Sequence, residues 1–139
     1  MQFTRRDTLA LGAGAAALAM LPFRVAAATA DERIAEFTGG AEAKADGITL
    51  TAPEIAENGN TVPITVDAPG ATSILLLATG NPTPGVAQYN FGPLSGSRVV
   101  TTRIRLAGTQ DVVALAKFED GSIAKASSTV KVTIGGCGG

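Results

Sequence analysis

The fold class of this sequence follows from one stretch near its C-terminus, Ala124-Lys-Ala-Ser-Ser-Thr-Val-Lys-Val-Thr-Ile134. Small and apolar side chains alternate with polar ones along the whole stretch. A period of two is typical of a β-strand with one face buried and the other in solvent. The buried set would be Ala124, Ala126, Ser128, Val130, Val132 and Ile134, and the exposed set Lys125, Ser127, Thr129, Lys131 and Thr133.

Four earlier segments also have strand patterns, and turn residues separate them. Val62, Ile64 and Val66 alternate in the first segment, whereas the second is apolar on both faces. Six or seven short strands with turns about every ten residues and no helix between them predict an immunoglobulin-like antiparallel β-sandwich over residues 31–134. The four segments are Thr61–Asp67, Ser73–Thr79, Val99–Ala107 and Asp111–Phe118, and Glu119-Asp120-Gly121 follows as a hairpin turn.

A short helix precedes the strands. Ile34, Ala35 and Phe37 have helical spacing within Asp31–Asp46, and the acidic residues at its start suit the positive end of a helix dipole. Gly39-Gly40 interrupts this pattern. We therefore expect one or two amphipathic helical turns in this segment.

The composition excludes several classes of function. The 139 residues include 11 Lys and Arg, 12 Asp and Glu, one Cys, and no His or Trp. Without histidine there is no Ser-His-Asp or Cys-His catalytic site, and one cysteine makes neither an internal disulfide nor a Cys-rich zinc site. A formal net charge of −1 and few aromatic residues give no surface suited to nucleic acid. We predict no catalytic residues, no metal and no cofactor.

Residues 1–30 have the features of an export signal. Thr4-Arg5-Arg6-Asp7-Thr8-Leu9 resembles the twin-arginine signal, which exports proteins already folded. The apolar run Leu9–Leu21 spans ~20 Å as a helix, too short for a stable membrane span. Two small-x-small cleavage sites follow, Ala26-Ala27-Ala28 and Ala28-Thr29-Ala30.

Cleavage after Ala30 leaves an acidic periplasmic domain. The mature chain has 109 residues, with 8 basic and 11 acidic side chains and a formal charge of −3. A chain of this size buries roughly 65% of its unfolded surface, which is enough for one core. Arg103 and Arg105 lie on the polar face of their strand, where charge more often serves solubility than anion binding.

The tail Gly135-Gly136-Cys137-Gly138-Gly139 holds the only thiol. Glycine restricts the backbone least and costs the most entropy to order, so residues 135–139 are predicted to form a flexible arm. Five extended residues span about 16 Å, which lets the thiol enter another protein's cleft. No neighbour in the sequence lowers the pKa of Cys137, so we expect its loading to depend on a partner enzyme's active site.

Other roles for Cys137 fit the sequence less well than a thiol on a flexible arm. A buried structural cysteine needs an ordered position, and prenylation needs a cysteine fourth from the end. A terminal Gly-Gly is also found in ubiquitin-like sulfur carriers, but their activation is cytoplasmic, which the export signal disfavours. An intermolecular disulfide stays open, and the alternative function is then a non-enzymatic periplasmic interaction module.

Several stretches resemble, in order, the SoxY family, the sulfur-carrier subunits of the bacterial thiosulfate-oxidising (Sox) system. The resemblance covers essentially the whole chain, and the tail contains no departure from the family pattern. The stretches are Glu57–Ile64, Asn81–Ala87, Ser97–Ala107, Gln110–Ala114 and the terminal Gly-Gly-Cys-Gly-Gly.

The resemblance implies a covalent carrier that is not itself an enzyme. It implies an immunoglobulin-like fold and pairing with SoxZ, a second small sandwich protein without an export signal. It also implies that a haem-containing oxidase joins Cys137 to thiosulfate, that a hydrolase then releases sulfate, and that a sulfane dehydrogenase oxidises the remaining sulfur. Gly135, Gly136, Gly138 and Gly139 match the flexible flanks of the carrier cysteine.

Two segments are candidates for the SoxZ interface. One is the doubly apolar run Ile74–Leu77, and the other is the Pro-rich loop Asn81–Pro84 beside it. A buried central strand explains Ile74–Leu77 equally well, so both readings of that run stay open.

Overall fold

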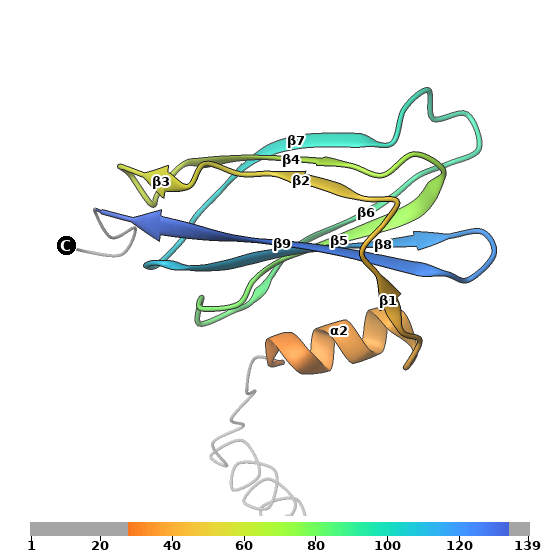
Figure 1. The fold of residues 1–139 in the computed structure, drawn as a ribbon, viewed down its shortest axis with the longest axis horizontal. Helices are drawn as coiled ribbons and strands as arrows, with labels where there is room; N and C mark the ends of the chain where they lie inside the picture. Colours follow the sequence, from red (N-terminus) through yellow and green to blue (C-terminus); the bar gives the residue numbers. More distant parts are fainter. Residues whose placement is uncertain (1–27, 134–139) are drawn as a thin grey trace, which may run out of the picture.

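Two β-sheets face each other in the computed structural model, which describes residues 28–133 (Figure 1). The larger sheet has the strand order β1-β9-β8-β5-β6, with β3 pairing to a further part of β9, and the smaller has the order β2-β4-β7. The larger sheet contains β1 (Ala43–Lys44), β3 (Ile55–Ala56), β5 (Ala71–Ala78), β6 (Gly85–Asn90), β8 (Gln110–Phe118) and β9 (Ile123–Val132). The smaller contains β2 (Thr49–Thr51), β4 (Val62–Asp67) and β7 (Val99–Ile104).

The predicted fold class, an all-β sandwich with a short N-terminal helix, is confirmed. Most neighbouring strands pair antiparallel, as expected. The short strands β1 and β3 are exceptions, because both pair parallel with β9. Neither was predicted, since a pair of residues is too short to show a sequence period.

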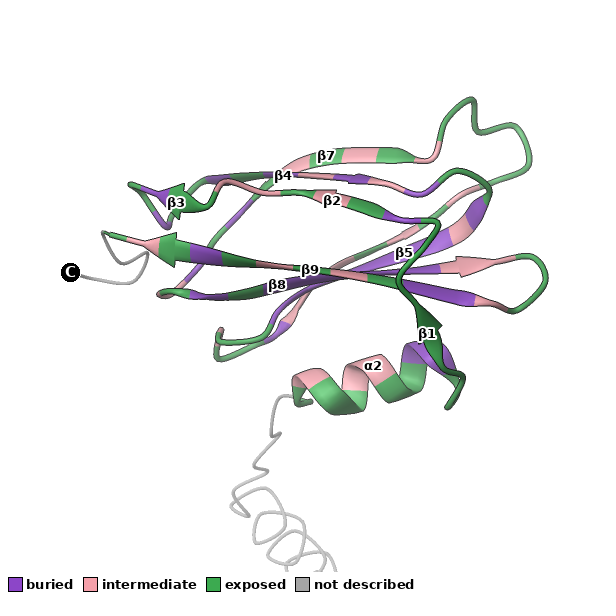
Figure 2. Ribbon diagram, in the orientation of Figure 1, coloured by how far each residue is buried: buried purple, intermediate pink, exposed green. Residues whose placement is uncertain are grey.

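Aliphatic side chains fill the space between the sheets. Strand β4 contributes Val62, Ile64 and Val66, the alternating set that the sequence predicted to be buried. They pack against the inward-facing residues of β5, β8 and β9. Figure 2 shows buried residues along much of β5 and β8, two neighbouring interior strands of the larger sheet.

Strand β5 is buried on both faces. Ile74 and Leu76 point into the sandwich core, whereas Leu75 and Leu77 belong to a second apolar cluster on the outer face of the larger sheet. Helix α2 (Ala30–Thr38) covers this outer cluster through Ile34 and Phe37 (Figure 1). The described domain therefore has three layers: the smaller sheet, the larger sheet and one helix.

Local sequence explains where helix α2 begins and ends. Thr29 is its N-cap, and Gly39 ends it in the left-handed conformation at φ 62°. Gly40 follows at φ 87°, after which the chain extends into β1. The predicted helical turn before Gly39 is confirmed, but the alanines after Gly40 are not helical, because two successive positive φ angles redirect the chain.

Most predicted strand boundaries agree with the structure to within a few residues. The hairpin turn between β8 and β9 is confirmed, and Gly121 has φ 81° there. Asp120 accepts hydrogen bonds from Ser122 N and Oγ in this turn, and these lower the pKa of the Asp120 carboxyl. The edge strand β6 was missed, because its mixed, partly exposed residues do not show a clear period of two.

The doubly buried strand predicts the effect of a core substitution. We expect Leu76→Ala to lower the free energy of unfolding by about 2–5 kcal/mol, because Leu76 is 0% exposed and its removal leaves a cavity. Ile55→Ala is the matched control: Ile55 is 58% exposed, and its loss should change the free energy by less than about 0.5 kcal/mol. Urea unfolding of the two variants checks this, and equal effects would contradict the assigned core.

Candidate functional site

Strand β9 leads to the predicted carrier arm, and its end is tightly held. Val132 N donates to Thr109 Oγ1 at 3.0 Å, and Thr133 N donates to Ala56 O at 3.1 Å. The Thr133 hydroxyl also donates to Glu57 O at 3.4 Å. The chain is therefore fixed to the domain as far as Thr133, the last residue that the structure describes.

All the predicted arm residues, Cys137, Gly135, Gly136, Gly138 and Gly139, lie outside the described residues. So do residues 1–27 of the predicted export signal. The structure instead defines the place from which the arm starts. We call this place the arm-exit end; it consists of Thr133 and the loops that surround it, residues 54–61, 79–84 and 105–110.

Asn81 ties two loops of the arm-exit end together. Its Nδ2 donates to Arg105 O at 2.8 Å, and its Oδ1 accepts from Ala107 N and from Gln110 Nε2, both at 2.9 Å. Gln110 Oε1 in turn accepts from Gly80 N at 2.9 Å. These bonds explain why β7 stops at Ile104 and not at the predicted Ala107: Asn81 takes the backbone groups that a longer ladder would need.

A close approach makes glycine necessary at position 80. A Cβ on Gly80 would lie 2.9 Å from Gln110 Cβ, a separation that real side chains essentially never show. The bonds of Asn81 and Gln110 therefore depend on the backbone coming close at this glycine.

A small cavity of about 220 Å³ lies at the arm-exit end, between the Asn81–Pro84 loop and the segment after β7. Its lining consists of Asn81, Pro82, Thr83, Arg105 and Ala107. Arg105 follows the end of β7 and lines this cavity, and Arg103 lies on β7. Both are exposed, as the sequence pattern predicted. The cavity contains no cysteine, and no pair of side chains in it is arranged for nucleophilic catalysis.

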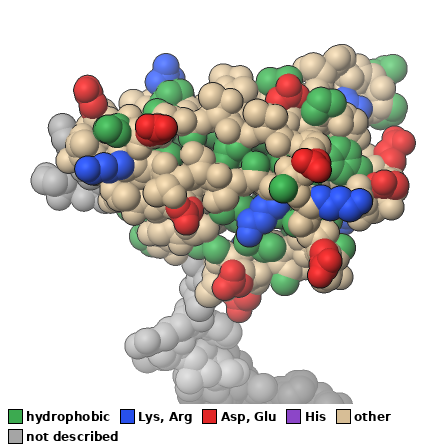
Figure 3. Space-filling view, viewed as in Figure 1, with side chains coloured by type: hydrophobic (Ala, Val, Ile, Leu, Met, Phe, Trp, Pro, Cys, Tyr) green, Lys and Arg blue, Asp and Glu red, His purple; other side chains and the backbone are tan. Residues whose placement is uncertain are grey.

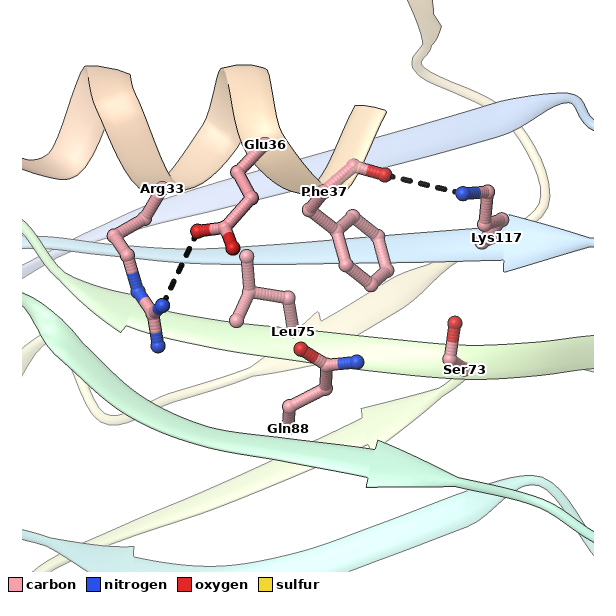
Figure 4. A pocket seen from close by; sticks show the side chains of 7 residues that line it. All are labelled: Arg33, Glu36, Phe37, Ser73, Leu75, Gln88 and Lys117. Atoms are coloured by element: carbon pink, nitrogen blue, oxygen red, sulfur yellow. Dashed lines mark hydrogen bonds and ion pairs between the residues drawn. The ribbon is translucent and has the colours of Figure 1, made fainter. Parts of the chain in front are cut away.

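A second cavity, of about 230 Å³, opens beside helix α2 on the outer face of the larger sheet (Figure 4). Arg33 Nη1 lies 3.3 Å from Glu36 Oε2, and Lys117 Nζ donates to Phe37 O at 3.3 Å. Lys117 also lies 5.8 Å from the Phe37 ring centroid. Because a cation at a helix C-terminus pairs with its free carbonyls, Lys117 holds the helix on the sheet. Ser73, Leu75 and Gln88 complete the lining.

The interactions of Lys117 could not be found from sequence. It lies 80 residues from Phe37 along the chain, and no local pattern marks such a contact.

On the face shown in Figure 3, acidic and basic side chains are interspersed, with no large area of one sign.

Residues 28–133 contain neither a cluster of metal ligands nor a membrane-spanning helix. No group of three or more Cys, Asp or Glu side chains in this range is close enough to hold a metal ion. No helix in the same range is long and apolar enough to cross a membrane.

Comparison with known proteins identifies the family. Residues 34–137 match the family model for the sulfur oxidation protein SoxY. The chain belongs to the SoxY family. The solved structure of the sulfur carrier protein SoxY from Chlorobium limicola f thiosulfatophilum is 37% identical, with a TM-score of 0.65, and the match covers 75% of this chain and 96% of that one.

Structures outside the SoxY family share the fold. A superoxide reductase (neelaredoxin) from Ignicoccus hospitalis has a TM-score of 0.55 at 19% identity, covering 81% of this chain and 99% of its own. At this identity the likeness concerns the fold alone. A search of proteins with curated functions found no match.

The apolar run Ile74–Leu77 was one of two candidate interfaces for a partner, and the structure supports the other explanation. All four side chains are at most 2% exposed within the single chain, because core residues cover one face and helix α2 covers the other. A surface this buried cannot contact another protein without unfolding. The Asn81–Pro84 loop, in contrast, has exposed residues at Pro82 and Thr83.

The bonds made by Asn81 predict the effect of its loss. Asn81→Ala should lower the free energy of unfolding by about 1–3 kcal/mol, because Ala107 N loses its acceptor and Nε2 of Gln110, a residue that is 8% exposed, keeps only Gly108 O. Asn60→Ala is the matched control: it removes an exposed amide at the same end and should change the free energy of unfolding by less than about 0.5 kcal/mol. Chemical denaturation measures both, and an Asn81 variant as stable as the parent would show that the loops do not depend on this side chain.

Proposed function

We propose that the chain is a periplasmic carrier protein that holds sulfur intermediates of thiosulfate oxidation covalently on Cys137. One observation carries this proposal: the Gly-Gly-Cys-Gly-Gly arm directly follows a strand whose last described residues are fixed to the domain. The family match also extends to residue 137, so it includes the cysteine. A rigid base and a glycine-rich end suit a thiol that must enter the active sites of other proteins.

The chemistry begins with the Cys137 thiol and thiosulfate. A sulfur–sulfur bond forms between Sγ and the outer sulfur of thiosulfate, the thiol proton goes to solvent, and two electrons pass to a haem-containing oxidase. Water then attacks the terminal sulfonate group, a hydrolase releases sulfate, and a persulfide stays on Cys137. A dehydrogenase then oxidises that sulfane sulfur to a sulfonate: three water molecules supply the oxygen atoms, the protons go to solvent, and six electrons pass to the dehydrogenase. The sulfur–sulfur bond suits this role because thiolates readily attack and leave such bonds.

The carrier acts with separate proteins in this proposal. It leaves the cytoplasm folded and bound to SoxZ, which lacks an export signal of its own. The oxidase, the hydrolase and the dehydrogenase then meet the same arm in turn. No resident metal or cofactor is needed on the carrier, since each enzyme brings its own catalytic groups.

The length of the tail decides where these enzymes bind. Cys137 lies four residues after Thr133, and four extended residues reach at most about 14 Å. An active site that receives the thiol must therefore approach the arm-exit end. The exposed residues Pro82 and Thr83 lie there, whereas Ser97 lies near Val99 and Asp67 at the opposite end of the sandwich.

A serine substitution tests the attachment site. Protein purified without reductant from thiosulfate-grown cells should have reducible sulfur adducts in its intact mass, located on Cys137 by peptide mapping. Cys137→Ser should remove every adduct and all thiosulfate-dependent turnover, while thermal unfolding stays unchanged. Free thiol alone, or a plain Cys137-linked dimer, would falsify the carrier and favour the interaction module.

A relocated thiol provides the matched control. Ser127 is exposed on the regular part of β9, so Ser127→Cys combined with Cys137→Ser moves the thiol from the arm to the sheet. We expect no sulfur adduct on this double variant. If it were loaded as fully as the parent, any exposed thiol would suffice, and the arm would have no specific role.

The expected docking position gives a further test. Thr83→Arg places a long charged side chain at the arm-exit end and should slow sulfur loading at least about tenfold, because a lost or blocked contact of ~1.4 kcal/mol changes a rate by that factor. Ser97→Arg makes the same change at the opposite end and should leave the rate within about twofold. The sulfur-loading rates of the two variants, measured by mass spectrometry with the partner oxidase, test this docking position. A larger decrease for Ser97→Arg than for Thr83→Arg would contradict docking at the arm-exit end.

A further inference from the structure

Helix α2 starts within the segment that sequence analysis assigned to the export signal. Thr29 Oγ1 accepts from Glu32 N at 3.3 Å, and Glu32 Oε2 accepts from Thr29 N at 2.7 Å. These two bonds form a complete capping box. Arg33 N also donates to Thr29 O at 3.1 Å. Thr29 is therefore part of the folded domain, although cleavage after Ala30 would remove it.

The two candidate cleavage bonds differ in accessibility. Ala28 and Thr29 are exposed and precede the helix, so the bond between them lies outside regular structure, and the bond's N–H is held only by the exposed Glu32 carboxylate. The bond after Ala30 lies inside the first helical turn, next to the hydrogen bond of Thr29 O. Proteolysis concentrates on exposed backbone outside regular structure. A peptidase that meets the folded domain can reach the first bond directly, whereas the second requires the helix to unwind.

The two bonds also leave different products. Cleavage after Ala30 removes the capping box and the first helical residue, which shortens a nine-residue helix that covers Leu75 and Leu77. Cleavage after Ala28 keeps Thr29 and all three of its bonds to the helix. The nitrogen that lies 2.7 Å from Glu32 Oε2 then becomes an ammonium group. An ammonium–carboxylate hydrogen bond is stronger than the amide–carboxylate bond it replaces.

We propose that the chain is processed at the Ala28–Thr29 bond, so that the mature protein begins with the N-cap residue of helix α2. This inference rests on the proposed function, because it requires export. Water adds across the amide bond: the oxygen goes to the Ala28 carbonyl carbon, and the Thr29 nitrogen leaves as the new amino terminus. Ala26-Ala27-Ala28 supplies the small residues that a signal peptidase requires before the cut.

A pair of leucine substitutions in the full chain tests the position of the cut. Ala28 belongs to both candidate sites, so the discriminating change is Ala26→Leu, which places a large side chain in Ala26-Ala27-Ala28 only and should reduce the fraction that starts at Thr29 about tenfold or more. Ala30→Leu does the same for the alternative bond and should leave processing unchanged. Mass spectrometry of the periplasmic product should find Thr29 as the first residue in the parent and in the Ala30 variant. A product that starts at Asp31, or a block by Ala30→Leu alone, overturns the inference.

The role of the cap is tested on the processed protein. Thr29→Ala should lower Tm by about 4–8 °C, whereas Thr29→Ser keeps the hydroxyl acceptor and should stay close to the parent. Equal Tm values for the two variants would show that Thr29 has no structural reason to be retained.

Failure of the export proposal gives a different result. An uncut chain confined to the cytoplasm overturns both export and processing. A chain that is exported and has sulfur on Cys137, but starts at another residue, overturns the cleavage position and leaves the carrier proposal standing.

Discussion

The whole domain depends on burying both faces of strand β5. One sheet can cover only one face of such a strand, so the inward-facing Ile74 and Leu76 require the β2-β4-β7 sheet. The outward-facing Leu75 and Leu77 require helix α2, which would be marginal alone at nine residues. Its capping box at one end and its bond from Lys117 at the other support it. A short helix thus becomes an essential layer of a β-protein.

This construction separates stability from chemistry. The core and the helix occupy the middle of the molecule, whereas the predicted reactive thiol lies beyond the last anchored residue, Thr133. Nothing in the core has to open for the thiol to be loaded. In the proposed function, the short distance between Thr133 and Cys137 brings every partner enzyme to the same end of the sandwich. The proposed carrier would then select its partners by the surface around its arm.

Sequence patterning predicted the strands with strong alternation, such as β4 and β9, because one buried face imposes a period of two. It could not find β6, an edge strand whose residues are mostly half-buried. It also extended β7 too far, because the residue that ends β7, Asn81, lies 24 residues from Arg105. The family was recognisable from local motifs, whereas the role of Cys137 stays a prediction. The arm-exit end was not recognisable, because it is assembled from loops that are distant in sequence.

The position of β9 between neighbours has a mechanical consequence. It pairs with β8 on one side and with β1 and β3 on the other, so it is not an edge strand. In the proposed function, an enzyme that holds the thiol and moves away along the axis of β9 pulls on that strand. The hydrogen bonds between strands lie across that axis and are loaded together in shear, whereas an edge strand pulled sideways would peel one bond at a time. In the proposed function, pairing on both sides of β9 would therefore let the domain resist tension each time an enzyme releases the arm.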